Sequence, residues 1–240
     1  MARLYDEDLA FIQASGFGEL ATAAAAAIIP TLRARGARRV VDVGCGAGVS
    51  TKALVDAGFD TLAIEPSAAL LDIARRTAPS ARFEQASAYD CTLDACDAIL
   101  AIGEALTYHG PSEDGEARLR DFIGEAGRAL VANGLLAFDL IERGGQSLTA
   151  RAWKAAPDWA VLSATHEEPE ASSLTREIET FRDVGGGTYR RRSEVHHVRL
   201  FDRAVVVSWL EEAGFEVEVT TTYGGVPLPR RRVAFLASRR

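Results

Sequence analysis

The most informative segment of the chain reads Val40-Val41-Asp42-Val43-Gly44-Cys45-Gly46-Ala47-Gly48. A short β-branched run is followed by glycines at alternate positions. Such a run, bounded by glycine, predicts a buried parallel strand over residues 39–43 with a sharp turn after it. Because glycine has no Cβ, a ligand can approach the main chain of this turn closely.

The rest of the chain alternates between helical and extended patterns. The pattern predicts helices at 4–14, 19–35, 50–57, 67–76, 112–131 and 203–213, and strands at 39–43, 61–64, 81–85, 98–102, 135–141, 215–222 and 233–238. Strands alternating with helices form βαβ units with right-handed crossovers, which gives a parallel sheet with helices on both faces. The fold class is therefore α/β, doubly wound and mainly parallel.

Residues 143–200 interrupt this alternation. They contain three predicted antiparallel strands, at 159–166, 174–182 and 188–200, and three consecutive glycines at 185–187 make a turn between the last two. The insertion is too short for an independent domain. We therefore expect one domain over 1–240, with N-terminal helices at 1–36 and a small antiparallel sheet at 143–200 that packs over one end of the main sheet.

Composition narrows the classes of partner. The chain has 240 residues, 48 % of them apolar, and a net charge of −7. This acidic balance gives no general attraction to nucleic acid phosphates. Three cysteines without CxxC spacing argue against a disulfide framework or a zinc site. Acidic residues near the N-terminus and an apolar run confined to 23–29 predict neither a signal peptide nor a membrane span, so we expect a cytoplasmic protein.

The spacing of the glycines separates two classes of ligand. A dinucleotide-binding turn has the pattern GxGxxG, whereas this turn has GxGxG with Asp42 two residues before it. A carboxylate there repels a pyrophosphate but can order a cationic ligand. S-adenosylmethionine carries an amino group and a sulfonium and has no phosphate.

A second acidic residue follows the next predicted strand. Glu65 lies 17 residues after Gly48, where a carboxylate can accept hydrogen bonds from both ribose hydroxyls of an adenosyl group. The alternative is that Glu65 caps the helix that begins after Pro66.

Together, Asp42-x-Gly44-x-Gly46-x-Gly48 and Glu65 resemble the first two motifs of class I S-adenosylmethionine-dependent methyltransferases. Residues 134–139 and 209–215 are similar to that family's fifth strand and to the helix and turn before its final hairpin. The resemblance implies seven strands in the order 3-2-1-4-5-7-6, the last antiparallel, and it implies S-adenosylmethionine as the cofactor. The predicted cofactor-binding residues are Tyr5, Asp42, Gly44, Cys45, Gly46, Gly48, Glu65, Pro66, Ser87, Ala88, Ile102 and Gly103.

One segment departs from the family pattern. After the third strand the family often has Gly-Asp-Ala, and its acid contacts the adenine amine. This chain has Ala86-Ser87-Ala88-Tyr89-Asp90 instead. The adenine contact then comes from the Ser87 hydroxyl, from the backbone at Ala88 or from the displaced Asp90.

The acceptor side is expected after the fourth strand and in the insertion. Candidate catalytic residues are Glu104, His109 and His196, each able to act as a general base. His196 and His197 are adjacent on a predicted strand and so point to opposite faces, and we expect His196 to face the site. Four aromatic residues are candidates either for lining an apolar pocket or for ordinary packing, namely Trp153, Trp159, Phe181 and Tyr189.

Two further groups of residues have surface or lid interpretations. The arginine runs at 190–192 and 230–232 are interpreted as solvated strand edges that discourage pairing. Tyr5 and residues 16–18 are candidates for a lid that closes the cofactor pocket, with helix packing as the alternative.

The predicted function is methyl transfer from S-adenosylmethionine to a small-molecule acceptor with a nitrogen or oxygen nucleophile, without a metal. No nucleic acid or membrane partner is expected, and a homodimer is left open. The alternatives are an NAD(P)-dependent oxidoreductase, which would use the same sheet and a glycine turn, and a non-catalytic S-adenosylmethionine-binding protein.

Overall fold

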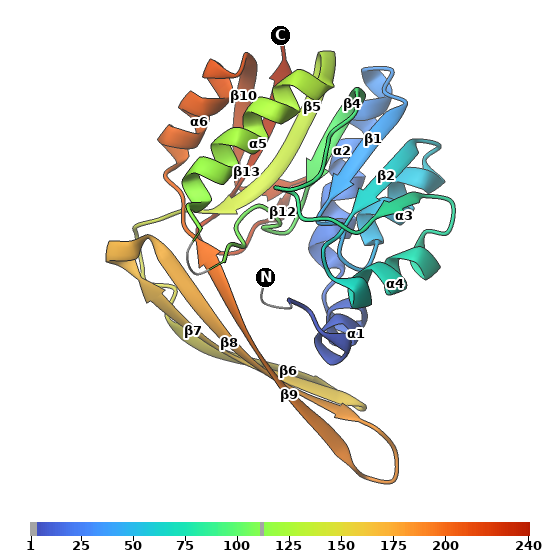
Figure 1. The fold of residues 1–240 in the computed structure, drawn as a ribbon, viewed down its shortest axis with the longest axis vertical. Helices are drawn as coiled ribbons and strands as arrows, with labels where there is room; N and C mark the ends of the chain where they lie inside the picture. Colours follow the sequence, from blue (N-terminus) through green and yellow to red (C-terminus); the bar gives the residue numbers. More distant parts are fainter. Residues whose placement is uncertain (1–3, 111–112) are drawn as a thin grey trace.

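The computed structural model describes residues 4–110 and 113–240 and is built around a seven-stranded sheet (Figure 1). The strand order is β3-β2-β1-β4-β5-β13-β10, and β13 runs antiparallel to both of its neighbours. The predicted order, 3-2-1-4-5-7-6 with an antiparallel last strand, is confirmed. The strands are β1 (Arg39–Val43), β2 (Asp60–Ile64), β3 (Arg82–Glu84), β4 (Cys96–Ala101), β5 (Leu130–Ile141), β10 (Phe215–Thr220) and β13 (Arg232–Arg239).

Helices cover both faces of this sheet. They are α1 (Glu7–Gly16), α2 (Glu19–Ala34), α3 (Val49–Asp56), α4 (Ala68–Thr77), α5 (Gly115–Ala129) and α6 (Arg203–Glu212). Four of these helices begin at a side-chain cap, since Asp6, Ser67, Asp114 and Asp202 each accept a hydrogen bond from a first-turn amide. The predicted start of the fifth helix at residue 112 lies outside the described residues.

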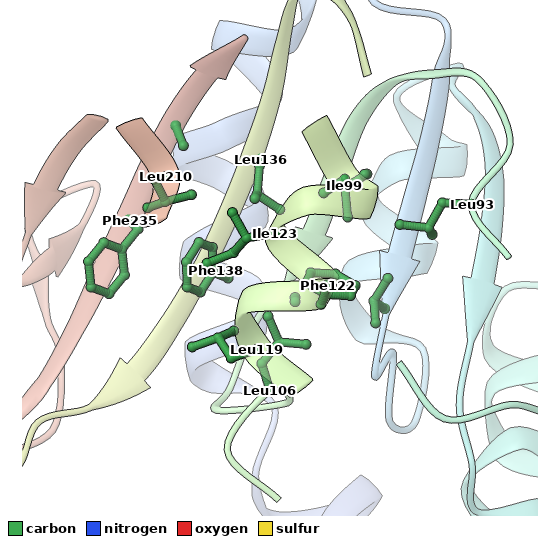
Figure 2. Close-up of a cluster of buried hydrophobic side chains, with 14 of the residues drawn as sticks. Leu93, Ile99, Leu106, Leu119, Phe122, Ile123, Leu136, Phe138, Leu210 and Phe235 are labelled. Carbon is green, nitrogen blue, oxygen red and sulfur yellow. The ribbon is translucent and has the colours of Figure 1, made fainter. Parts of the chain in front are cut away.

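Each face of the sheet has its own apolar core. On one face, Leu119 and Phe122 of α5 and Leu210 of α6 pack against Phe138 of β5 and Phe235 of β13 (Figure 2). On the other face, the second cluster is formed by side chains of α2 and α3 and by alternate residues of the same strands. Strands buried on both faces are expected of a mainly parallel sheet, which explains why the apolar runs in the sequence are nearly continuous.

A second sheet, here called the lid sheet, projects beyond the carboxyl ends of the central strands (Figure 1). It contains β6 (Ala150–Ala156), β7 (Trp159–Glu168), β8 (Ser173–Asp183) and β9 (Tyr189–Arg199), all antiparallel, with a short 3-10 helix at Pro169–Ala171. Sequence patterning found three of these strands and missed β6. None of the residues of β6 is buried, so the strand lacks the alternation that marks a half-buried one.

Several smaller expectations are corrected by the structure. Trp153 is 77 % exposed and Tyr189 is 49 % exposed, so neither lines a pocket. Trp159 is buried, but against Leu9 and Ile12 of α1, which is ordinary packing. The segment after β10 forms a separate two-stranded hairpin, β11 (Thr222–Tyr223) and β12 (Val226–Pro227), in place of a longer strand.

Helix α1 docks on the lid sheet through a buried carboxylate. Asp8 is 1 % exposed and accepts hydrogen bonds from Arg182 (3.3 Å) and from Arg190, whose Nε lies 2.7 Å away. Arg190 is thus engaged with α1, whereas the side chains of Arg191 and Arg192 are exposed, as the solvated-edge interpretation requires. Within the described residues no single helix is long and apolar enough to cross a membrane; α1 and α2 pass only as a pair bent by 58°.

Candidate functional site

The glycine turn after β1 has one open position and two crowded ones. A Cβ on Gly44 would lie 2.5 Å from Cβ of Ala105, and one on Gly48 would lie 3.0 Å from Cα of Ala74 in α4. At Gly46 a Cβ would meet no atom within 4 Å. Packing within the protein therefore already explains Gly44 and Gly48, whereas the space beside Gly46 is open.

Asp42 anchors this turn to the helix that follows it. Its Oδ2 accepts hydrogen bonds from Ser50 (2.8 Å) and Thr51 (2.6 Å) at the start of α3, and its side chain is 1 % exposed. Burial, opposed by these two hydrogen bonds, raises the pKa of Asp42 to about 6. The geometry gives Asp42 a role in shaping the turn.

Glu65 joins the first turn to the second. Its Oε2 accepts a hydrogen bond from the amide of Gly46 (3.0 Å), and its Oε1 accepts one from the amide of Ser67 (2.9 Å). The carboxylate is buried, and this burial, opposed by the two amide bonds, raises the pKa of Glu65 to about 7. The bond to Ser67 fits the capping alternative, and the bond to Gly46 places the carboxylate beside the open position of the glycine turn.

Neighbouring residues of the predicted set complete this edge. Cys45 is buried, and its amide donates to the carbonyl of Ile64 at 3.1 Å. Pro66 is exposed, and its carbonyl accepts a hydrogen bond from Gln85 (3.4 Å). Ile102 is buried at the end of β4, in the core that lies against α2 and α3.

The segment in place of the family's Gly-Asp-Ala makes a compact turn. The Ser87 hydroxyl accepts a hydrogen bond from the amide of Tyr89 (3.2 Å), and the Tyr89 hydroxyl donates to the carbonyl of Leu106. Asp90 is exposed and pairs with Arg118 at 3.0 Å. Of the three sources left open for an adenine contact, Asp90 is thus already held by an arginine, while Ser87 and Ala88 lie on the turn itself.

The turn after β4 is held by a residue that sequence reasoning placed only in a strand. Asp139 of β5 accepts hydrogen bonds from the amides of Gly103 and Glu104, both at 2.8 Å. Asp139 is 0 % exposed, and the Tyr223 hydroxyl also donates to it at 3.2 Å. An acidic residue inside an otherwise apolar strand was the available signal, because a fully buried carboxylate requires partners.

Glu104 lies in the centre of a buried ion cluster. Arg176 of β8 and Arg232 of β13 both bond its carboxylate, the second Arg176 bond at 3.1 Å. Burial alone would raise the pKa of Glu104, but Arg232 and Arg176 outweigh it and hold the value at about 2. A carboxylate with this pKa is a weak proton acceptor at neutral pH, so the geometry argues against Glu104 as a general base.

The same contacts correct the interpretation of the second arginine run. The Arg232 side chain is only 12 % exposed, and that of Arg231 is 9 % exposed and pairs with Glu167 at 2.8 Å. Only Arg230 remains at the surface. Arg231 and Arg232 can be buried because Glu167 and Glu104 pair with them. No local pattern in the sequence predicts these pairs.

His196 is buried and packs among aromatic rings. Its ring lies 5.1 Å from that of Tyr5 and 5.7 Å from that of Tyr108, and the two tyrosine hydroxyls are 3.1 Å apart. Glu194 accepts a hydrogen bond from His196 Nε2 (2.9 Å) and another from the amide of Tyr5 (2.7 Å). His196 is 1 % exposed, whereas Val195 is 47 % exposed and faces away.

His109 does not join this group. Its ring pairs with that of His197 at 6.5 Å, and its Nδ1 lies 2.7 Å from the carbonyl of Gly110. Because His197 lies on the opposite face of β9 from His196, the structure separates His109 from the Tyr5–Tyr108–His196 group. Glu104 belongs to that group through a hydrogen bond from the Tyr108 hydroxyl (3.2 Å).

A cavity of about 270 Å³ lies between the lid sheet and the end of β5. Arg176 and Arg232, which hold Glu104, form part of its wall. The remaining wall is mostly apolar; the lining residues are Ile141, Leu148, Thr165, Leu174, Arg176, Pro229, Arg230 and Arg232. A second cavity, of about 320 Å³, lies between α2 and β10. Neither cavity is lined by a residue of the predicted site.

Known proteins resemble this chain in the region that contains the candidate site. A family model described as a methyltransferase domain matches residues 40–134, which include the glycine turn, Glu65 and the Gly103–Glu104 turn. A Geobacillus sp. (strain WCH70) protein named "Putative methyltransferase" is 26 % identical over 215 residues, covering 79 % of this chain and 78 % of its own length.

The matched domain and these similar proteins support a class I S-adenosylmethionine-dependent methyltransferase.

Solved structures of methyltransferases share the complete fold. The sugar N-methyltransferase KedS8 of Streptoalloteichus sp. is 25 % identical, with a TM-score of 0.79 over 100 % of this chain and 94 % of that one. The amino pentose methyltransferase CalS10 of Micromonospora echinaspora, solved with S-adenosylmethionine bound, is 20 % identical, with a TM-score of 0.74 over 99 % and 98 %. The structural similarity therefore extends over the whole length of this methyltransferase, and the oxidoreductase alternative is set aside.

Proposed function

We propose that this methyltransferase transfers the methyl group of S-adenosylmethionine to a small molecule through a nitrogen or oxygen nucleophile. The observation that carries the proposal is the open main chain at Gly46 beside the buried carboxylate of Glu65. An adenosyl ligand needs both, because its ribose hydroxyls require acceptors and its body requires close approach to the backbone.

The cofactor contacts follow from this placement. Glu65 accepts the ribose hydroxyls, using the lone pairs that its two amide bonds leave free. Ser87 and Ala88 lie at the end of β3 beside β2, where the adenine is expected. Gly103, where a Cβ would meet no atom within 4 Å, offers its main chain to the methionine part. The bound cofactor supplies an electrophilic methyl group on a sulfonium.

His196 is the residue best suited to accept a proton from the acceptor. Because His196 donates a hydrogen bond from Nε2 to the Glu194 carboxylate, the free lone pair of the ring lies on Nδ1. Tyr5 and Tyr108 cover this ring and exclude water from it. Exclusion of water strengthens the electrostatic interactions inside the site.

The acceptor is proposed to bind in the 270 Å³ cavity beside the Glu104 cluster. Its mixed wall of apolar side chains and arginines suits a compact organic molecule with polar substituents. One similar structure is that of a sugar N-methyltransferase, which supports a nitrogen nucleophile, and another is that of an amino pentose methyltransferase. Cytoplasmic location, the lack of nucleic acid and membrane partners, metal independence and homodimer formation remain predictions.

Calorimetric titration followed by a transfer assay tests the proposal. We expect S-adenosylmethionine and S-adenosylhomocysteine to bind with micromolar affinity and NADH not to bind. Radiolabelled methyl transfer is then screened against amino sugars and matched sugars that carry a hydroxyl in place of the amine, with Glu65→Ala as the cofactor-site control. Labelled product from neither set, with the cofactor bound, would contradict the proposed acceptor class.

A further inference from the structure

Asp139 stands directly behind the turn that follows β4. Its two carboxylate oxygens each accept one backbone hydrogen bond, Oδ2 from Gly103 and Oδ1 from Glu104, both at 2.8 Å. The side chain reaches this turn because β5 lies next to β4 in the sheet. One buried carboxylate therefore fixes two successive peptide groups.

These two bonds determine which way the carbonyl groups of the turn face. A trans peptide unit is planar, so its carbonyl oxygen points opposite to its N–H, and the described chain contains no cis peptide bond. Since the N–H groups of Gly103 and Glu104 point at Asp139, the carbonyl oxygens of Ile102 and Gly103 point away from it. The space beside Gly103 is open for 4 Å in the direction of a Cβ.

The turn needs this support, because its backbone is in an unfavourable conformation. Gly103 has a φ of 84° and Glu104 a φ of 60°, so two successive residues are left-handed. For a residue with a side chain, such as Glu104, this region is strained. Charge-assisted hydrogen bonds from both amides to one carboxylate are strong enough to hold it.

We propose that Asp139 is a positioning residue for the cofactor. It turns the carbonyl oxygens of Ile102 and Gly103 toward the methionine part of S-adenosylmethionine, where they accept hydrogen bonds from its ammonium group. Asp139 is itself held by the Tyr223 hydroxyl at 3.2 Å and by the Arg232 guanidinium at 3.5 Å. This inference rests on the proposed function and assigns a role in the same site to a residue that does not touch the ligand.

The test compares two ligands that differ in the methionine part. S-adenosylhomocysteine has the amino acid group, whereas 5′-methylthioadenosine has the adenosine and the thioether without it. Asp139→Asn keeps the side-chain volume but turns one acceptor oxygen into an NH₂ group that faces an N–H. We expect it to weaken S-adenosylhomocysteine binding by roughly 10- to 100-fold and methylthioadenosine binding by less than about twofold.

Asp97→Asn is the matched control, because Asp97 likewise accepts hydrogen bonds from two successive backbone amides, those of Arg38 and Arg39, but at the opposite end of β4 from the Gly103–Glu104 turn. We expect both ligands to bind it within about twofold of the wild-type affinity. Unchanged binding of S-adenosylhomocysteine to Asp139→Asn, or an equal loss for both ligands, would overturn the inference, the second because it indicates general loosening. Wild-type protein that binds neither ligand would instead overturn the proposed function.

Discussion

Glu65→Gln tests the carboxylate at the centre of the proposed cofactor site. Burial raises the pKa of Glu65 from 4.5 to about 7 against the amide bonds from Ser67 and Gly46. If the ribose hydroxyls bind only the ionised form, protonation at pH 6 leaves about one molecule in ten competent. We therefore expect S-adenosylhomocysteine to bind the wild-type protein about tenfold more weakly at pH 6 than at pH 8.

The variant should lose both the affinity and its pH dependence. Glutamine offers one acceptor oxygen in place of two, so binding at pH 8 should weaken by about 1–3 kcal/mol. Because glutamine does not ionise between pH 6 and pH 8, the titration curves of the variant should be the same at both values. Calorimetry with S-adenosylhomocysteine measures both quantities on one preparation.

The raised pKa of Glu65 has the opposite effect on stability: ligand affinity rises with pH, whereas the free energy of unfolding falls. The native state holds a proton at Glu65 more tightly than the unfolded chain does, so the free energy of unfolding falls as the pH rises from about 4.5 to about 7. This difference in pKa corresponds to about 3 kcal/mol. The stability of Glu65→Gln relative to the wild type should therefore rise by about 3 kcal/mol between pH 4 and pH 8.

Urea denaturation at four pH values, read beside the binding data, checks this reasoning. If the variant gains stability relative to the wild type at high pH and also loses affinity, the Glu65 carboxylate destabilises the fold there and serves ligand binding. The reasoning is refuted if the stability difference is flat with pH, or if the wild-type protein binds S-adenosylhomocysteine equally well at pH 6 and pH 8.

Three further predictions concern other parts of the site. Gly48→Ala should destabilise the protein by about 2–3 kcal/mol and Gly46→Ala by about 1 kcal/mol, because of the two only the Cβ added at position 48 meets backbone, at 3.0 Å. Gly46→Ala should cause the larger loss of cofactor affinity. Thermal melts with and without S-adenosylhomocysteine compare the two variants. Arg232→Met should cost about 3–5 kcal/mol by leaving buried carboxylates uncompensated, whereas Arg230→Met at the surface should change the unfolding free energy by about 0.5 kcal/mol or less in urea titrations. His196→Asn should lower kcat about 10²- to 10⁴-fold with little change in cofactor affinity, and an unchanged kcat would remove His196 as the base.

Most of the fold could be predicted because its signals are local. Strand β1 coincides with the predicted 39–43, and α2 differs from its prediction by one residue, since apolar run length and helix propensity are properties of neighbouring residues. Strand β6 was missed because an exposed edge strand needs no apolar alternation. The two-residue strands β11 and β12 are too short to carry any periodicity.

Only the part of the candidate site that directly follows strands in the sequence was predictable. The glycine turn and Glu65 follow directly after strands, so the topology brings them together. The partners of Glu104 lie 72 and 128 residues away, and no spacing rule connects them. The low pKa of Glu104 and the burial of Arg232 are consequences of that distant pairing. For this reason the sequence did not reveal that Arg232 is buried, nor that Glu104 is a weak proton acceptor.

The Glu104 cluster also constrains how this enzyme can diverge. Glu104, Asp139, Arg176 and Arg232 come from four separate segments and carry equal numbers of positive and negative charges. Replacing one member leaves an uncompensated charge inside the protein, so single substitutions there are expected to destabilise the fold. Since Arg176 and Arg232 also line the 270 Å³ cavity, a change to either arginine requires a matching change at Glu104 or Asp139, which couples the lining of the cavity to the stability of the cluster.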